Sequence, residues 1–275
     1  MVKSMVFKKS ELEKNISYYA NILKKDLVEE IDDDKNVKSL LNKKKHYITD
    51  KIYVRIPTVG EIIKDEQRYY SLVSSFTSVP YQYMVQLDDM GIDYTQISEY
   101  ELFMMMFVAN CNNDLSAIFG NLDTNGYEVY HDQSNNSMVL CKKDNSDEVI
   151  INEFIYYQIA DILRKINNFE KCKYKPGNEH TRKYLLEKER RKLKRNSKKP
   201  YEPYLEKLVI ALVNRPEFKY NYEETMNLSL YKFNQSFKQI QTSINFDNTM
   251  IGVYAGTVDT SKLKDKSCLS WIPIN

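Results

Sequence analysis

Apolar residues recur with a helical period in the last third of the chain. From Met226 to Ile244 they are spaced by four and three positions in alternation. This spacing puts one apolar side chain on the same face at every turn, as in helices that pack against a second helix. We therefore predict one helix over this seam, and we take its strongest apolar positions as residues that pack or bind a partner: Phe233, Phe237, Ile240 and Ile244.

Two glycines follow this apolar repeat and mark the end of the helical pattern. Gly252 and Gly256 follow the periodic stretch, and no helical pattern continues after them. We expect the remaining residues, Thr257–Ile272, to run as a strap along the helix. The strap carries the chain's one tryptophan, Trp271, which we expect to anchor it as a further packing or partner-binding residue.

Further helices are predicted from start signals in the rest of the chain. A Ser or Thr followed three residues later by Glu forms a capping box, in which each side chain satisfies a free amide of the first turn. This motif begins at Ser10, Thr58 and Ser98. Short apolar repeats predict a helix over 153–167 and another over 202–214, and Pro80 opens a short helix that Gly91 closes.

Two segments have the patterns of strands. Residues 47–56 are rich in β-branched and aromatic side chains and end at Pro57, so we predict one strand there. Residues 126–151 alternate apolar and polar positions in three short runs, which predicts a three-stranded meander. The expected fold class is therefore mostly α with a small antiparallel β-meander, an α+β fold, and a helical C-terminal module.

Charge divides the chain into three parts. The sequence has 40 Lys and Arg against 38 Asp and Glu, but the segment Lys171–Lys199 holds 13 basic residues and three Glu. We predict an N-terminal helical body over 1–170, a basic connecting helix within 171–199, and a C-terminal helical module over 200–275. The connecting helix, over about 178–196, carries few apolar side chains, so its own stability is marginal.

Composition argues against several classes of protein. No run approaches the ~18 apolar residues of a membrane span, and no signal peptide is visible at the start. The four cysteines are far apart, whereas a zinc site needs clustered ligands, so we expect no metal and no cofactor. With seven glycines there is no phosphate-binding loop motif, so a nucleotide site is not expected either.

The candidate catalytic groups are isolated. Glu217 and Lys219 match half of a metal-dependent nuclease motif, but they are predicted to lie in a loop without the preceding Asp. His131 and Cys141 lie in adjoining predicted strands and could be neighbours, although a buried Cys is usually a small apolar residue. We therefore expect no enzymatic activity.

A family resemblance is carried by four phrases in the segment 214–272. They are Asn-Arg-Pro-Glu-Phe-Lys-Tyr, Leu-Tyr-Lys-Phe-Asn-Gln-Ser-Phe-Lys-Gln-Ile-Gln, Gly-Val-Tyr-Ala-Gly-Thr-Val-Asp-Thr-Ser-Lys-Leu and Leu-Ser-Trp-Ile. These phrases, with Ile-Ser-Glu-Tyr-Glu-Leu-Phe at 97–103, resemble tail-assembly or morphogenesis proteins of phages that infect low-GC Gram-positive bacteria. The basic segment 171–199 departs from that pattern.

The resemblance implies a role in binding other proteins. It implies a chaperone of the tape-measure protein or a minor virion component, with other phage tail proteins as partners and self-association left open. It also implies the host cytoplasm during assembly, or the virion, as the location. No catalytic residues are carried over from the family.

The basic helix supports an alternative function. Six of its side chains could neutralise phosphates and bind nucleic acid: Arg182, Lys183, Arg190, Arg191, Lys194 and Arg195. Against this stands a solvated helix, with internal pairs to its own Glu residues or a protein partner, and that interpretation is favoured.

Overall fold

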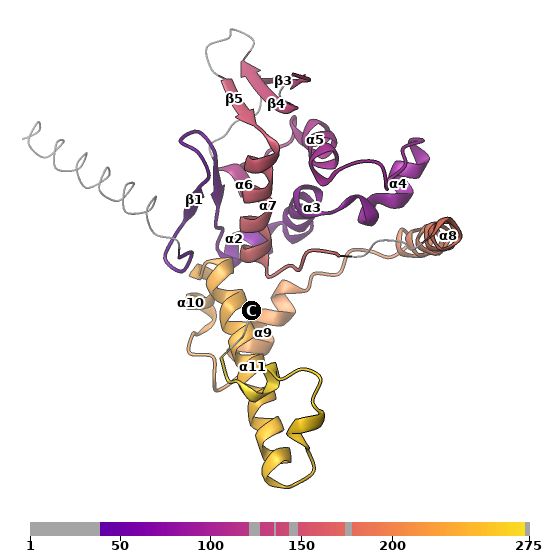
Figure 1. Ribbon diagram of the computed structural model, residues 1–275. Helices are drawn as coiled ribbons and strands as arrows, with labels where there is room; N and C mark the ends of the chain where they lie inside the picture. The colour runs from indigo at the N-terminus through magenta and orange to yellow at the C-terminus, as the bar shows by residue number, and fades with distance from the viewer. Residues whose placement is uncertain (1–38, 121–126, 135, 143–147, 174–177, 273–275) are drawn as a thin grey trace, which may run out of the picture.

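The computed structural model describes residues 39–120, 127–134, 136–142, 148–173 and 178–272. Within these ranges the chain is mostly helical, with a two-stranded and a three-stranded antiparallel sheet (Figure 1). The predicted α+β class is therefore confirmed. The helix predicted to begin at Ser10 lies outside the described residues.

The first sheet corrects one prediction. Residues 47–56 form no single strand: β1 (Lys45–Tyr47) and β2 (Tyr53–Arg55) pair as an antiparallel hairpin. The turn between them is made by Thr49, whose hydroxyl accepts a hydrogen bond from the Ile52 amide at 3.0 Å. A threonine that bonds to the backbone close by competes with strand pairing, which is why the chain reverses here.

The second sheet is the predicted meander. Strands β3 (Tyr127–Asp132), β4 (Ser137–Lys142) and β5 (Glu148–Ile151) pair in sequence order, all antiparallel. One face packs on the helices, because Met138, Leu140, Val149 and Ile151 are buried. The buried Tyr100 hydroxyl joins this sheet to the body, since it donates to the Ile151 carbonyl and accepts from the Met138 amide.

Two helices of the body begin at the predicted capping boxes. Both described capping boxes, at Thr58 and Ser98, are formed. The helix predicted after Thr58 is broken at Asp65, which ends one helix and caps the next. The helical elements are α2 (Val59–Lys64), α3 (Glu66–Thr77), η1 (Pro80–Tyr83), α4 (Met84–Asp89), α5 (Glu99–Asn110), α6 (Ser116–Phe119) and α7 (Glu153–Asn167).

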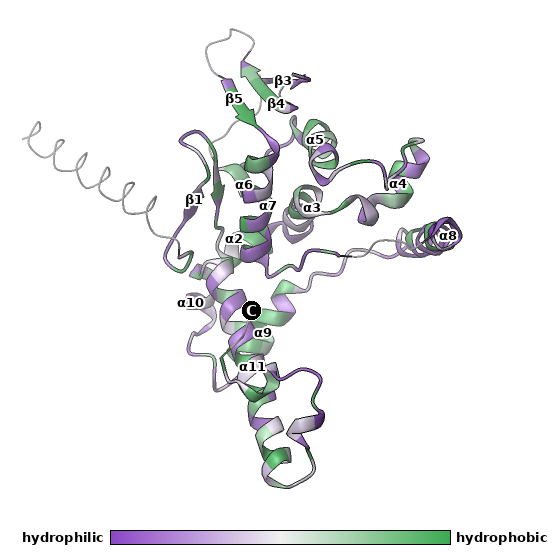
Figure 2. Cartoon of the chain, viewed as in Figure 1, coloured by the Kyte–Doolittle hydropathy of each residue, from purple (hydrophilic) through white to green (hydrophobic). Residues whose placement is uncertain are grey.

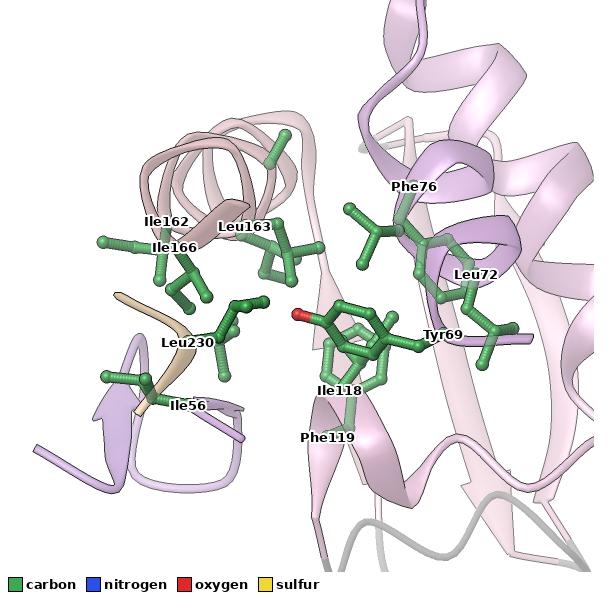
Figure 3. Packing of buried hydrophobic residues seen from close by; sticks show 14 of the residues in the cluster. Ile56, Tyr69, Leu72, Phe76, Ile118, Phe119, Ile162, Leu163, Ile166 and Leu230 are labelled. Atoms are coloured by element: carbon green, nitrogen blue, oxygen red, sulfur yellow. The ribbon is translucent and has the colours of Figure 1, made fainter. Parts of the chain in front are cut away.

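Five helices of the body, α2, α3, α5, α6 and α7, share one apolar core with the two sheets. Helix α7 buries one face along its length, and the ring of Tyr156 lies 4.7 Å from that of Phe103 on α5. Phe76 of α3 contacts Phe103, Phe107 and Phe119. Figure 3 shows the Tyr69 side chain of α3 directed toward Leu163 and Leu230. Burying large rings in this way is the main stabilising contribution in such a body.

The C-terminal third contains the remaining described elements. They are α8 (Glu179–Asn196), α9 (Leu205–Val213), α10 (Tyr222–Asn227), α11 (Leu230–Tyr254), η2 (Thr260–Lys262) and η3 (Ser267–Leu269). The single helix predicted from Met226 is wrong at its start, because the chain is extended at Leu228 and Ser229. There the Val59 amide donates to the Leu228 carbonyl and the Leu230 amide to the Pro57 carbonyl, so pairing with the body interrupts the helix.

The core continues from the body into the C-terminal third. Leu230 and Phe233 are fully buried, and Figure 3 places Leu230 between Ile56 and Ile166. Gly60 of α2 lies so close to α10 that an added Cβ would stand 3.0 Å from the Met226 carbonyl oxygen. The first turns of α11 are therefore part of the body, while its far end extends away from it with the strap (Figure 1).

Candidate binding surfaces

Helix α11 is partly buried in its first half and more exposed in its second half. It is 25 residues long, and its buried residues are Leu230, Phe233, Asn234 and Ile240, all in its first half. Beyond Ile244 it has none. Figure 2 shows apolar residues at the far end of this helix, away from the body. We call residues 244–272, which comprise the second half of α11 and the strap, the distal arm.

The apolar stripe of α11 runs on into the distal arm. Ile251 follows Ile244 by seven residues and Tyr254 follows by three more, so both continue the face that carries Phe233 and Ile240. Ile251 is 67% exposed and Tyr254 is 82% exposed. The face that packs on the body at its near end is thus open to solvent at its far end.

Within the distal arm, the strap packs on the second half of α11 at Gly252. Its backbone turns back at Gly256, where φ is +71°, and the Thr257 and Val258 amides donate to the Gly252 carbonyl at 2.9 and 3.1 Å. A Cβ on residue 252 would lie 2.6 Å from a Val258 methyl carbon, so only glycine allows this contact. Gly252 therefore does not end the helix, as the sequence suggested, but admits the strap.

Trp271 does not anchor the strap by burial. Its side chain is 58% exposed, and the contact that holds this end is a hydrogen bond from Gln239 Nε2 to the Trp271 carbonyl oxygen at 2.8 Å. The other predicted partner-binding residues face inward. Phe233 and Ile240 are buried in the core, and Phe237 and Ile244 pack against it partly buried.

Helix α8 is a second surface, and its inner side is held by the body. Leu186 and Leu193 pack against a small apolar cluster around Met84, Leu87 and Tyr94. This cluster is separate from the main core, and no residue of α8 is buried. Apolar packing alone therefore holds the helix only weakly.

Ion pairs hold the same side of α8. Arg190 donates to Asp89 at 2.6 Å and to Asp88 at 2.7 Å, and Arg182 pairs with Asp93 at 2.8 Å. The Thr95 amide and hydroxyl, together with the Arg182 guanidinium, hold the pKa of Asp93 below its ordinary value. These three carboxylates neutralise two of the six basic residues singled out in the sequence.

The other basic residues singled out on α8 pair along the helix or are exposed. Lys183 pairs with Glu179 at 2.9 Å and Arg191 with Glu187 at 3.1 Å, along the helix itself. Lys194 and Arg195 are exposed and line a shallow hollow on the outer side of the helix. Sequence reasoning missed the other basic residues of that hollow: Lys188, Lys198 and Lys199.

The candidate catalytic residues are not brought together. Cys141 lies opposite Glu128 in the sheet, whereas His131 lies opposite Met138 and bonds to Asn136 at 2.9 Å. Glu217 pairs with Arg215, and Lys219 donates to the Pro216 carbonyl oxygen. Within the described ranges, no three His, Cys, Asp or Glu residues lie where they could hold a metal ion.

Among the described residues, no helix combines the length and the apolar character needed to cross a membrane.

Comparison with known proteins gives one match. Residues 194–274 match a family model described as the YomV second domain, from a family associated with Bacillus phages of the SPBeta type. The matched segment is less than a third of the chain and contains α9, α10, α11 and the strap. No curated protein and no solved structure matches the chain. The C-terminal third is therefore similar to a domain of a phage-associated family, as the resemblance in the sequence indicated.

Proposed function

We propose that this chain is a phage assembly or structural protein that works by binding another protein chain, without catalysis. The observation that carries the proposal is the stripe on α11, which is buried on the body at Phe233 and Ile240 and uncovered at Ile251 and Tyr254. A helix that extends beyond its own core with its apolar face open is typical of a docking element.

The spacing of the exposed residues favours a helical partner. Ile251 and Tyr254 are three residues apart on one face of α11, so a single partner helix can contact both, as in helix-in-groove binding. Each large apolar side chain that becomes buried contributes about 1.5–3 kcal/mol, so we take these two side chains as the anchors of a larger interface with polar contacts at its rim. The long helical tape-measure protein of a phage tail is the partner we propose.

The family match supports the phage context of this proposal. The segment similar to a phage-associated family is the one that contains the whole distal arm. We propose that binding takes place in the host cytoplasm while the tail assembles. The chain then either leaves the particle or stays as a minor component.

The proposal is tested by capture from phage-producing cells. The tagged full chain is isolated from these cells and its partners are identified by mass spectrometry. We expect the tape-measure protein or another tail component to co-purify, and we expect the double variant Ile251→Asp, Tyr254→Asp to lose it. A charged group on a buried apolar face costs several kcal/mol, which is enough to abolish a moderate interaction.

A control variant tests whether the loss of the partner is specific to the distal arm or follows from a charge at any exposed apolar site. Phe154 on α7 is 69% exposed and lies on the body, so Phe154→Asp places a carboxylate at an exposed apolar site elsewhere. This control is expected to retain the tail protein. The proposal is wrong if the double variant keeps its partner, if both variants lose it, or if the captured chain is only a second copy of this protein.

A further inference from the structure

The outer side of α8 has a strong local charge that the proposed function does not use. Six basic side chains surround the hollow there, against Glu187 as the acidic residue of its lining. The basic residues are Lys188, Arg191, Lys194, Arg195, Lys198 and Lys199. We call this group the outer basic face.

The helix is held so that this face stays open. Asp88, Asp89 and Asp93 all pair with arginines of the opposite side, so the acidic groups nearest to α8 are already engaged. Apart from the pair between Arg191 and Glu187, no ion pair is found for the outer basic face within the part of the chain that the structure describes. The charge pattern is therefore two-sided, with neutralised contacts inside and excess positive charge outside.

The face is long and straight enough to follow a phosphate backbone. From Tyr184 to Lys199 the helix and its last turn span about 23 Å, at about 1.5 Å per residue. Duplex DNA presents one negative charge for every ~1.7 Å of its axis, so six basic groups on this length meet several phosphates at once. Tyr184, 63% exposed, stands in the same row and adds a hydroxyl donor.

The outer basic face lacks the apolar anchor residues that a protein interface needs. Protein interfaces depend on a buried core of apolar anchors, and charged residues, Lys above all, are depleted there. Tyr184 is the one large apolar side chain in the lining of this hollow. Phosphate contacts need no such anchor, because release of bound counterions drives the association.

We infer that the outer basic face of α8 binds the phosphate backbone of nucleic acid, without sequence preference. The inference goes beyond the proposed function and does not depend on it, because the distal arm and α8 are separate surfaces. It also changes the residues suggested by sequence alone: Arg182 and Arg190 hold the helix in place, and Lys188, Lys198 and Lys199 join the contact set.

The test is a salt titration with the full chain. Binding to a short fluorescein-labelled DNA duplex is followed by anisotropy over a range of salt concentrations. With six phosphate contacts the slope of log K against log salt is about −5, and affinity falls about 1,000-fold between about 50 and about 200 mM salt. A single-stranded DNA arm and a polyglutamate arm are measured in parallel.

The key variant reverses three charges of the face: Arg191→Glu, Arg195→Glu, Lys198→Glu. We expect a loss of about 100-fold or more at low salt and a slope reduced to about −3, since three contacts are gone. The matched control makes the same net charge change on exposed lysines of the strap: Lys262→Glu, Lys264→Glu, Lys266→Glu. It is expected to bind with nearly unchanged slope.

Several outcomes would overturn the inference. They are no binding to either DNA form, equal loss in the face variant and the strap control, or polyglutamate that binds as tightly as DNA of equal charge. The last result would assign the face to an acidic protein instead. Should the reversed-charge variant fold poorly by circular dichroism, the neutral set Arg191→Gln, Arg195→Gln, Lys198→Gln answers the same question through its slope.

Discussion

The two halves of α11 have the same residue pattern in opposite surroundings. In the first half the apolar stripe lies in the core, with Phe233 fully buried and its ring 6.2 Å from that of Phe218. In the second half the same stripe carries Ile251 and Tyr254 into solvent. One helix thus serves as a core element at one end and, in our proposal, as a docking element at the other. We therefore expect substitutions in the first half to lower stability and substitutions in the second half to weaken partner binding.

The largest expected effect is on stability, from a substitution in the first half. Phe233→Ala should lower the free energy of unfolding by about 3–5 kcal/mol, because it removes a buried ring and leaves a cavity between α11 and the body. Urea denaturation followed by circular dichroism measures this change.

Phe154→Ala is the matched control for that prediction. Its phenylalanine is exposed on α7, so the change should alter stability by no more than about 0.5 kcal/mol. Equal effects of the two substitutions would mean that the near half of α11 is not part of the core.

A smaller effect is expected where α11 meets the end of α7 through a polar contact. The buried Asn234 amide donates from Nδ2 to the Ile166 carbonyl oxygen at 2.9 Å, in the last turn of α7. Asn234→Ala leaves that carbonyl without this donor and should cost about 1–3 kcal/mol. Asn245→Ala, on the exposed part of the same helix, should change the denaturation midpoint very little. Comparable midpoints for the two variants would contradict the assignment.

The smallest expected effect on stability comes from the second half. Ile251→Asp with Tyr254→Asp replaces exposed side chains, so the free energy of unfolding should stay within about 0.5 kcal/mol of the parent value. The same pair of changes is expected to abolish partner binding. A stability loss of several kcal/mol would show instead that the distal stripe is covered within the chain, and would remove the basis of the proposed function.

Local patterns predicted most of the elements well. The capping boxes at Thr58 and Ser98 rest on contacts within one helical turn, so they can be recognised from four residues. The meander over 126–151 and the helix over 153–167 follow from the periods of two and of 3.6, which are properties of the backbone. Wrong predictions occurred where distant segments compete with the local pattern. Residues Leu228 and Ser229 are extended because they pair with the backbone beside Thr58, far away in the sequence.

The burial and exposure of individual side chains were predicted less well, for a physical reason. The sequence pointed to Phe233, Phe237, Ile240 and Ile244 as partner-binding, and all four pack inward. The predicted seam ended at Ile244, although Ile251 and Tyr254 continue the same stripe, and that continuation was the available signal. On α8 the sequence could count basic residues but could not assign them to sides, because Asp88 and Asp89 stand about a hundred positions from Arg190.

The order of residues alone therefore accounts for the helical period of α11, the charge of α8 and the start of each capped helix, because these depend on neighbours within one or two turns. Which stretch of the α11 stripe is covered, and which side of α8 is neutralised, depend on where the body ends in space. Burial and ion pairing are properties of contacts between remote segments. The same type of apolar or basic residue is therefore buried or paired where the body covers it and exposed where the body ends.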